Sequence, residues 1–102
     1  MTFIDRDYIA RQREWSHRTF GPGARTQGIV EHIGKELQEI GWSPYDIMEW
    51  VDVIILALDG AWRSGYEPEE ILSALHEKQA INFARQWPDW RGNEDRAIEH
   101  IR

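Results

Sequence analysis

The chain has 102 residues, which is enough for one domain. Its formal net charge of −6 argues against a non-specific nucleic-acid or membrane-surface binder, because such proteins rely on a basic surface. With no cysteine, the chain has neither disulfides nor thiolate metal ligands. A charged N-terminus and short apolar runs argue against a signal peptide and a membrane span, so we expect a cytoplasmic protein.

The first helix is predicted near the N-terminus. Thr2 with Asp5 three residues later forms a capping-box pattern, and the helix runs to about Ser16. The segment TFGPGARTQG that follows is rich in Gly and Pro and cannot continue a helix. We expect this Gly/Pro loop to be a mobile or ligand-covering segment.

The second and third helices are predicted to form an antiparallel pair. Thr26 caps the second helix, Gln27 to Ile40, whose apolar residues recur at helical spacing. Ser43 caps the third, which starts at Pro44 and ends near Arg63. Only the residues GWS separate the two helices, and so short a connection favours antiparallel neighbours.

The fourth helix has Pro68 in its first turn, together with acidic residues that suit the helix dipole. Because Pro88 stops it, this helix is predicted to run to about Trp87, and the polar tail beyond has room for one more short helix. No segment alternates with the period of a strand. The chain is therefore predicted to be all-α, a compact bundle of four to five helices in a single domain over residues 1–102. Its small core favours a homo-oligomer, either a dimer or a tetramer.

The third helix carries acidic residues within an apolar background. At about 100° per residue, Glu49, Asp52 and Asp59 fall within roughly 80° of arc, and apolar side chains cover the other faces. Such a helix is normally buried on most sides. Because an isolated buried carboxylate is costly, these acids need a cation. For Asp59 we favour an ion pair with Arg63, four residues on.

A second acidic pair lies on the preceding helix. Glu36 and Glu39 are three residues apart, as are Glu49 and Asp52, so an antiparallel pair of helices can assemble these four carboxylates into a box. Oxygen ligands of this kind suit Mg²⁺ or Mn²⁺. For Glu36 and Glu39 alone, an ordinary exposed acidic pair is an equally good interpretation.

One face of the fourth helix changes from apolar to cationic along its length. Ile71 and Leu75 continue on the same face as Lys78, Asn82 and Arg85. These donors are suited to binding phosphate oxygens. They are equally suited to ion pairing with the acids of the third helix or to reaching the surface.

The acidic motif resembles a known family. The spacing Glu36-x-x-Glu39 followed by Glu49-x-x-Asp52 resembles the signature of the MazG-type all-α nucleoside triphosphate pyrophosphohydrolases. The strings EWSHRTFGPGARTQGIVEHIGKELQEI, EWVDVIILALDGAWR and KQAINFARQWPDWR are similar to the dATP/dGTP diphosphohydrolase (MazZ-like) branch, which is common in phages and prophages. Lys35 departs from the broader family, which often has an acid there, and this leaves the number of bound metals open.

The resemblance implies an enzyme that uses Mg²⁺ or Mn²⁺ to cleave dATP or dGTP between the α- and β-phosphates. The products are the monophosphate and pyrophosphate, so the enzyme would control purine deoxynucleotide pools. The metal ligands that it implies are Glu36, Glu39, Glu49 and Asp52. The phosphate-binding residues that it implies are Lys78, Asn82 and Arg85. Either Glu36 or Glu39 would accept the proton of the attacking water.

Base recognition needs a stacking surface and hydrogen-bonding groups. Beside the Gly/Pro loop, the candidates are Trp15, His17 and Phe20, although Trp15 and Phe20 suit core packing equally well. The alternative to an enzyme is a non-catalytic helical interaction module whose acids and bases form an interfacial salt-bridge network.

Overall fold

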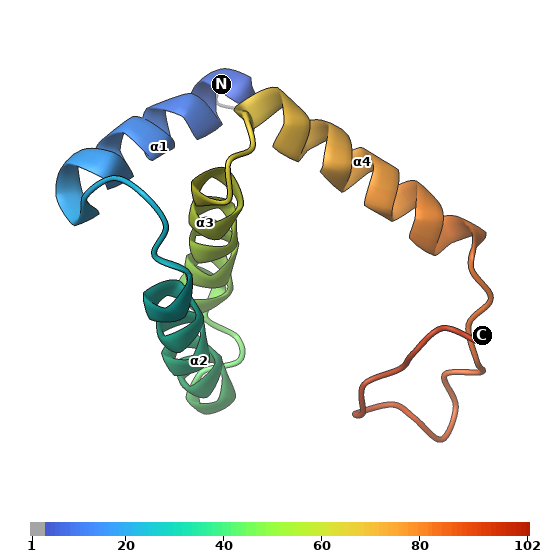
Figure 1. Cartoon of the computed structure of the whole chain (residues 1–102). Helices are drawn as coiled ribbons and strands as arrows, with labels where there is room; N and C mark the ends of the chain where they lie inside the picture. The colour runs from blue at the N-terminus through green and yellow to red at the C-terminus, as the bar shows by residue number, and fades with distance from the viewer. Residues whose placement is uncertain (1–3) are drawn as a thin grey trace. The chain divides into compact units, whose positions relative to one another are not determined.

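The computed structural model describes residues 4–102, which form four α-helices and no strand. The helices are α1 (Arg6–Phe20), α2 (Thr26–Trp42), α3 (Ile47–Arg63) and α4 (Pro68–Ala84) (Figure 1). The all-α prediction is therefore confirmed. Within the described range, no helix combines the length and the hydropathy that crossing a bilayer requires.

The chain divides into two compact units, Met1–Leu72 and Ser73–Arg102, with the boundary inside α4. The first unit holds α1, α2, α3 and the start of α4. The second holds the rest of α4 and the irregular segment that follows it. The single domain over residues 1–102 stays a prediction.

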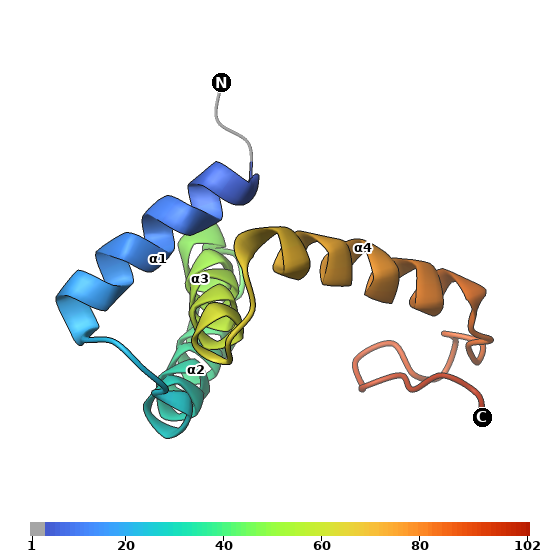
Figure 2. The ribbon, with the colours of Figure 1, turned by 45° about the horizontal axis from the view of Figure 1, so that its top comes forward.

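Helices α2 and α3 lie side by side and run in opposite directions, as Figures 1 and 2 both show. The predicted antiparallel pair is thus present. Ile29 and Ile40 of α2 are buried, as is Trp62 of α3. Helix α1 packs against α3, and the side chain of Ile9 on α1 is fully buried. These contacts fix the relative positions of the three helices that surround the candidate site.

The boundaries of α1 differ from the prediction. Asp5 is itself the N-cap, because its carboxylate accepts the backbone N–H of Tyr8 at 2.8 Å. Thr2, the predicted cap, lies outside the described residues. The helix continues past Ser16 to Phe20, since nothing interrupts it before Gly21, whose φ of 90° ends it.

The connection between α2 and α3 is also corrected. Helix α2 runs past Gly41 to Trp42, and α3 starts at Ile47 with Asp46 as its N-cap, so the connection is residues 43–46. The carboxylate of Asp46 accepts the backbone N–H of Met48 at 3.0 Å. Pro44 therefore lies in the turn, where its carbonyl accepts the indole N–H of Trp50 at 2.9 Å. Asp46 rather than Ser43 is the N-cap of α3, because its carboxylate also interacts favourably with the positive end of the helix dipole.

Helix α4 begins at Pro68 as predicted but ends at Ala84 rather than near Trp87. The indole N–H of Trp87 donates to the carbonyl of Asn82 at 2.9 Å, which folds the chain back at the end of the helix. No helix follows between residues 85 and 102, so the expected short fifth helix is absent from the described chain. Pro88 and Gly92, the latter at φ 87°, favour turns there.

A buried ion pair joins α1, the Gly/Pro loop and α3. Arg63 pairs with Asp59, as the sequence predicts, and its side chain is only 2% exposed. The same guanidinium donates to the carbonyls of Gly21 at 2.8 Å and Gly23 at 2.9 Å. It also donates to the hydroxyl of Ser16 at 2.9 Å, and this hydroxyl in turn donates to Asp59 at 2.7 Å.

Replacing Arg63 with Ala is expected to lower the free energy of unfolding by about 3–5 kcal/mol, because Asp59 would remain buried without its cation. Urea unfolding at a fixed protein concentration measures this. The matched control is Arg18→Ala, which removes an exposed pair with Glu14 and should cost less than about 1 kcal/mol. Equal losses in the two variants would contradict a central role for Arg63.

Candidate metal centre and adjoining cavity

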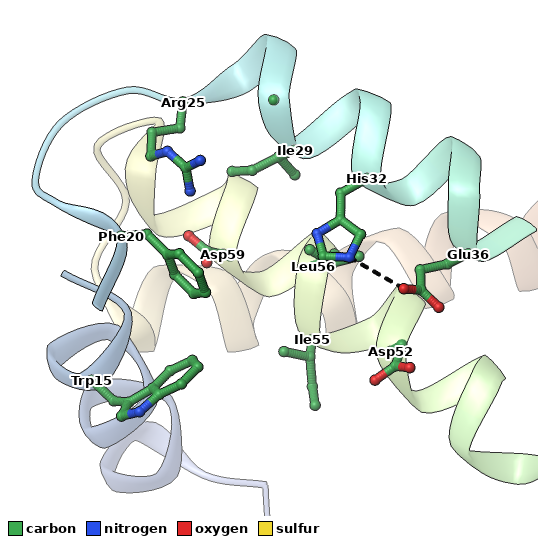
Figure 3. A pocket seen from close by; sticks show the side chains of 11 residues that line it. Trp15, Phe20, Arg25, Ile29, His32, Glu36, Asp52, Ile55, Leu56 and Asp59 are labelled. Atoms are coloured by element: carbon green, nitrogen blue, oxygen red, sulfur yellow. Dashed lines mark ion pairs between the residues drawn. The ribbon is translucent and has the colours of Figure 1, made fainter. Parts of the chain in front are cut away.

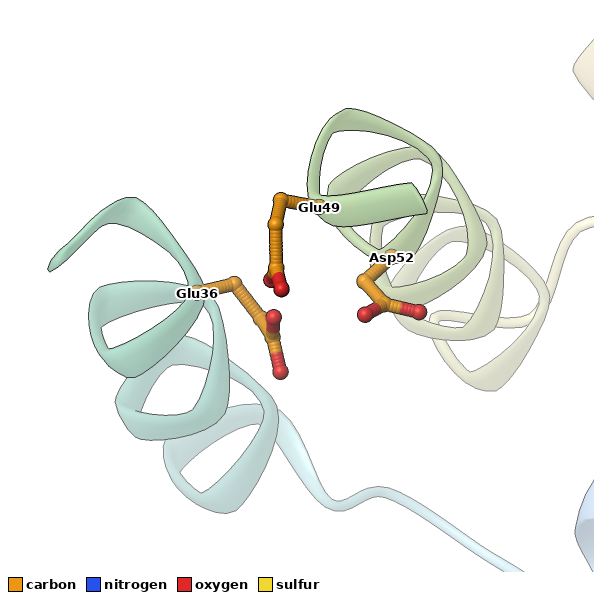
Figure 4. A group of neighbouring side chains, drawn as sticks. All are labelled: Glu36, Glu49 and Asp52. Carbon is orange, nitrogen blue, oxygen red and sulfur yellow. The ribbon is translucent and has the colours of Figure 1, made fainter. Parts of the chain in front are cut away.

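Three carboxylates converge between α2 and α3. Glu36 comes from α2, whereas Glu49 and Asp52 come from α3, and one oxygen of each lies within 4.8 Å of the others (Figure 4). Glu36 is buried, Glu49 is half-buried and Asp52 is exposed. The antiparallel pairing of the two helices therefore brings together three of the four carboxylates of the predicted box.

The fourth acid, Glu39, is exposed but lies close enough to influence its neighbours. The carboxylate of Glu39, which can accept a hydrogen bond from protonated Glu49, raises the pKa of Glu49 to about 7, and burial contributes to the same shift. Burial above all, and then Glu39, raises the pKa of Glu36 as well. The metal-free cluster thus retains protons at a pH where isolated carboxylates have lost them.

The cluster has unsatisfied oxygens. Within the described chain, Oε2 of Glu36 and Oε2 of Glu49 are buried and have no hydrogen-bond partner. The other oxygen of Glu36 lies 3.2 Å from Nε2 of His32, one helical turn away. Buried acceptors without donors are costly unless a cation binds them. An all-oxygen set of this kind fits a hard divalent cation such as Mg²⁺ or Mn²⁺.

A cavity of about 360 Å³ adjoins the cluster inside the first unit. Figure 3 shows Glu36 and Asp52 at one end of it and Trp15, Phe20 and Arg25 at the other. Between these ends the lining is mainly apolar, with Gly28, Ile29, His32, Ile55 and Leu56. The carboxylate of Asp59 also lines the cavity and lies near Phe20 in Figure 3. The cavity therefore offers an anionic end at the carboxylate cluster, an apolar middle, and an aromatic end that holds both the guanidinium of Arg25 and the carboxylate of Asp59.

Of the predicted base-binding residues, Trp15 and Phe20 both line this cavity. Their rings meet edge to face with centroids 5.6 Å apart, and both side chains are about half exposed, so neither is a core residue. His17 is not among the residues described as lining the cavity, and its carbonyl accepts the N–H of Gly21 at 3.0 Å.

The predicted phosphate-binding residues lie in the second unit. Lys78 and Asn82 are on α4, and Arg85 is the first residue after its end. Arg85 donates to the side-chain oxygen of Asn82 at 3.3 Å. The role of these residues in phosphate binding stays a prediction.

Sequence reasoning missed two residues of this region, Ser16 and Arg25. Ser16 is 1% exposed and completes the network around Arg63, but a serine in a helix carries no signal of that contact. Arg25 is the N-cap of α2, where its side chain makes no capping hydrogen bond. The sequence predicted Thr26 as this cap, and that prediction is wrong because Thr26 is the first residue of α2, so no signal in the sequence marked Arg25.

The fold and the site together define an all-α protein with a carboxylate cluster suited to divalent cations. Residues 8–102 match the model of the dATP/dGTP pyrophosphohydrolase family, and the chain belongs to this family.

Two relatives are informative. The chain is 39% identical over 93 residues to the Eaa protein of Salmonella phage P22, a match that covers 90% of the chain but only 29% of that relative. It is 31% identical to the MazG-like pyrophosphohydrolase of cyanophage S-2L, with a TM-score of 0.73 and full coverage of both chains. That structure contains dGDP and three catalytic Mn²⁺ ions per active site.

Without metal, the protein is expected to lose thermal stability as the pH rises from about 5 to 8. Glu49 has a pKa of about 7 in the folded state, against 4.5 for a free side chain. The folded protein therefore binds more protons than the unfolded chain between these values, and stability falls as the pH rises through that window.

Thermal unfolding in the presence of a chelator, measured across this pH range, tests the expectation. Glu49→Gln should flatten the profile because its amide does not titrate. Glu31→Gln, an exposed site on α2, serves as the control and should leave the profile unchanged. A wild-type profile that rises over this window would contradict the raised pKa.

Proposed function

We propose that this protein hydrolyses dATP and dGTP between the α- and β-phosphates, releasing pyrophosphate and the nucleoside monophosphate. The observation that carries the proposal is the convergence of Glu36, Glu49 and Asp52 within 4.8 Å, beside a cavity with an aromatic end. The family supports the reaction, and the bound dGDP of the cyanophage enzyme supports a purine nucleotide.

In this proposal Glu36, Glu49 and Asp52 hold Mg²⁺ or Mn²⁺. Divalent cations held by these residues would neutralise the triphosphate, polarise the phosphoryl group and make water a better nucleophile. The buried and unpartnered oxygens of Glu36 and Glu49 are the atoms that fit this use. The three Mn²⁺ ions of the cyanophage enzyme support Mn²⁺ as one suitable metal.

The fourth acid has a different place in the proposal. Glu39 is exposed at the edge of the cluster, whereas Glu36 is buried and contacts His32. We therefore assign proton acceptance from water to Glu39 and cation binding to Glu36. Sequence reasoning left these two open, and exposure is what separates them, because a proton acceptor must reach a solvent molecule.

The base and the phosphates of the nucleotide are assigned to residues by the chemistry of their side chains. Trp15 and Phe20 stack on the purine ring, and the resemblance assigns the phosphates to Lys78, Asn82 and Arg85. His17 stays a candidate for the base from the sequence alone. Such an enzyme controls purine deoxynucleotide pools. Two phage proteins among its relatives support a phage or prophage origin and action in the host cytoplasm.

We also propose a homo-oligomer. The first unit fully buries few apolar side chains, whereas Trp42, Tyr45, Ile47 and Met48 around the α2–α3 turn are 66–100% exposed. Exposed apolar side chains gathered in this way favour contact with a second copy.

The central experiment measures pyrophosphate release from each of the four dNTPs with Mg²⁺ or Mn²⁺. The wild type is expected to act on dATP and dGTP. Glu49→Gln keeps the shape of the side chain but removes its charge, and should lower kcat by about a hundredfold or more. Glu31→Gln is the matched control and should keep full activity. Folded wild-type protein that releases no pyrophosphate from any dNTP would refute the proposal.

A second measurement separates the enzyme from a non-catalytic interaction module. Millimolar Mn²⁺ is expected to raise the Tm of the wild type by several degrees, because the metal binds the folded state alone. Glu36→Gln and Glu49→Gln should each remove this increase. A salt-bridge network would gain nothing from divalent metal, so an unchanged Tm at saturating Mn²⁺ favours the interaction module.

A further inference from the structure

Arg25 is a cation without an ionic partner at the aromatic end of the cavity. Its guanidinium lies over the ring of Phe20, 5.4 Å from the ring centroid. Among residues 4–102 no carboxylate forms an ion pair with it. Asp59 lines the same cavity, but its two oxygens already accept from Arg63 and Ser16. The N–H donors of Arg25 therefore remain available to a ligand.

Apart from its contact with Phe20, the side chain of Arg25 makes no hydrogen bond or ion pair with residues 4–102. Arg25 is the N-cap of α2, yet its side chain makes no capping hydrogen bond. Its methylene and guanidinium groups pass beside Gly28, where an added Cβ would lie 3.7 Å from a terminal nitrogen. Figure 3 shows the guanidinium directed from the start of α2 toward Phe20 and the cavity. A residue that breaks a local preference is often one retained for a ligand.

The position of Arg25 decides which part of a nucleotide it meets. Cations held by Glu36 and Asp52 draw the phosphates to the opposite end of the cavity. The base then lies beside Trp15 and Phe20, within reach of Arg25. Arginine is suited to this place because its planar fork stacks on an aromatic ring and still presents donors in its own plane.

We propose that Arg25 reads the N7 edge of the purine base. One N–H donates to N7, an acceptor that adenine and guanine share and that pyrimidines lack. A second N–H donates to O6 of guanine, as arginine does when it binds this edge of guanine in DNA. Adenine carries an amino group at that position and so accepts only one hydrogen bond. This inference rests on the proposed function and extends it to the choice of base.

The experiment compares dGTP with 7-deaza-dGTP, which has a carbon in place of N7. In the wild type, kcat/KM is expected to fall by about tenfold on 7-deaza-dGTP, in line with the loss of one specific base contact. Arg25→Ala should lower kcat/KM on dGTP by about tenfold and by less on dATP. In Arg25→Ala, kcat/KM should be nearly the same on dGTP and on 7-deaza-dGTP, because the group that binds N7 is already absent.

Two variants frame this result. Because guanine accepts two hydrogen bonds from Arg25 and adenine only one, the wild type should have a higher kcat/KM on dGTP than on dATP. Arg25→Lys keeps the charge but loses the planar fork, so this difference in kcat/KM should largely disappear. Arg18→Ala removes an exposed arginine of α1 that does not line the cavity and should behave as the wild type does. Equal losses on dGTP and 7-deaza-dGTP in Arg25→Ala would overturn the proposal and place Arg25 against the sugar or a phosphate.

A binding readout separates this inference from the proposed reaction. Quenching of tryptophan fluorescence, to which Trp15 contributes, reports binding of dGMP and 7-deaza-dGMP without any turnover. The wild type is expected to bind dGMP about tenfold more tightly, and Arg25→Ala to bind both alike. This result in a protein that releases no pyrophosphate would support base recognition and refute only the reaction. Equal binding of both nucleotides by the wild type would overturn the inference.

Discussion

The guanidinium of Arg63 is the contact on which the first unit depends. It is almost fully buried, and its donors meet Asp59, Ser16 and two carbonyls of the Gly/Pro loop. A buried charge is tolerated only when its hydrogen bonds are complete, and here they are completed by groups from α1, the loop and α3. The loop is therefore fixed at both Gly21 and Gly23. This fixes the directions in which Phe20 and Arg25, which flank those glycines, enter the cavity.

Helix α3 carries two groups of acids that differ in whether a basic side chain of the protein pairs with them. Asp59 is neutralised by Arg63 within the protein. Glu49 and Asp52, two to three turns earlier, face Glu36, and no lysine or arginine of the described chain pairs with them. The neighbouring carboxyl group of Glu39 and burial raise the pKa of Glu49, and burial followed by Glu39 raises the pKa of Glu36. The electrostatic cost that the protein leaves uncompensated is the one that a bound cation removes.

The sequence predicted the acids better than it predicted the ends of the helices. Spacing alone placed Glu36 opposite Glu49, because a short connection leaves two helices one way to pair. Helix ends were less certain because several residues compete to cap them, and Asp46 prevailed over Ser43. Arg25 was beyond reach for another reason. Its direction depends on contacts between the loop and Arg63, about forty residues away.

Helix α2 links the two ends of the cavity as a rigid spacer. Arg25, Ile29, His32 and Glu36 follow one another at three or four residues, so they line a single face of the helix. At 1.5 Å per residue, Arg25 and Glu36 are separated by roughly 16 Å along the axis. Insertion of one residue between them would rotate one end by about 100° and turn it out of the cavity. The distance between Arg25, the proposed base-reading residue, and the carboxylate cluster is thus set by the helix itself, which requires that its first turn be held in place. The contacts of Arg63 with the preceding loop meet that requirement.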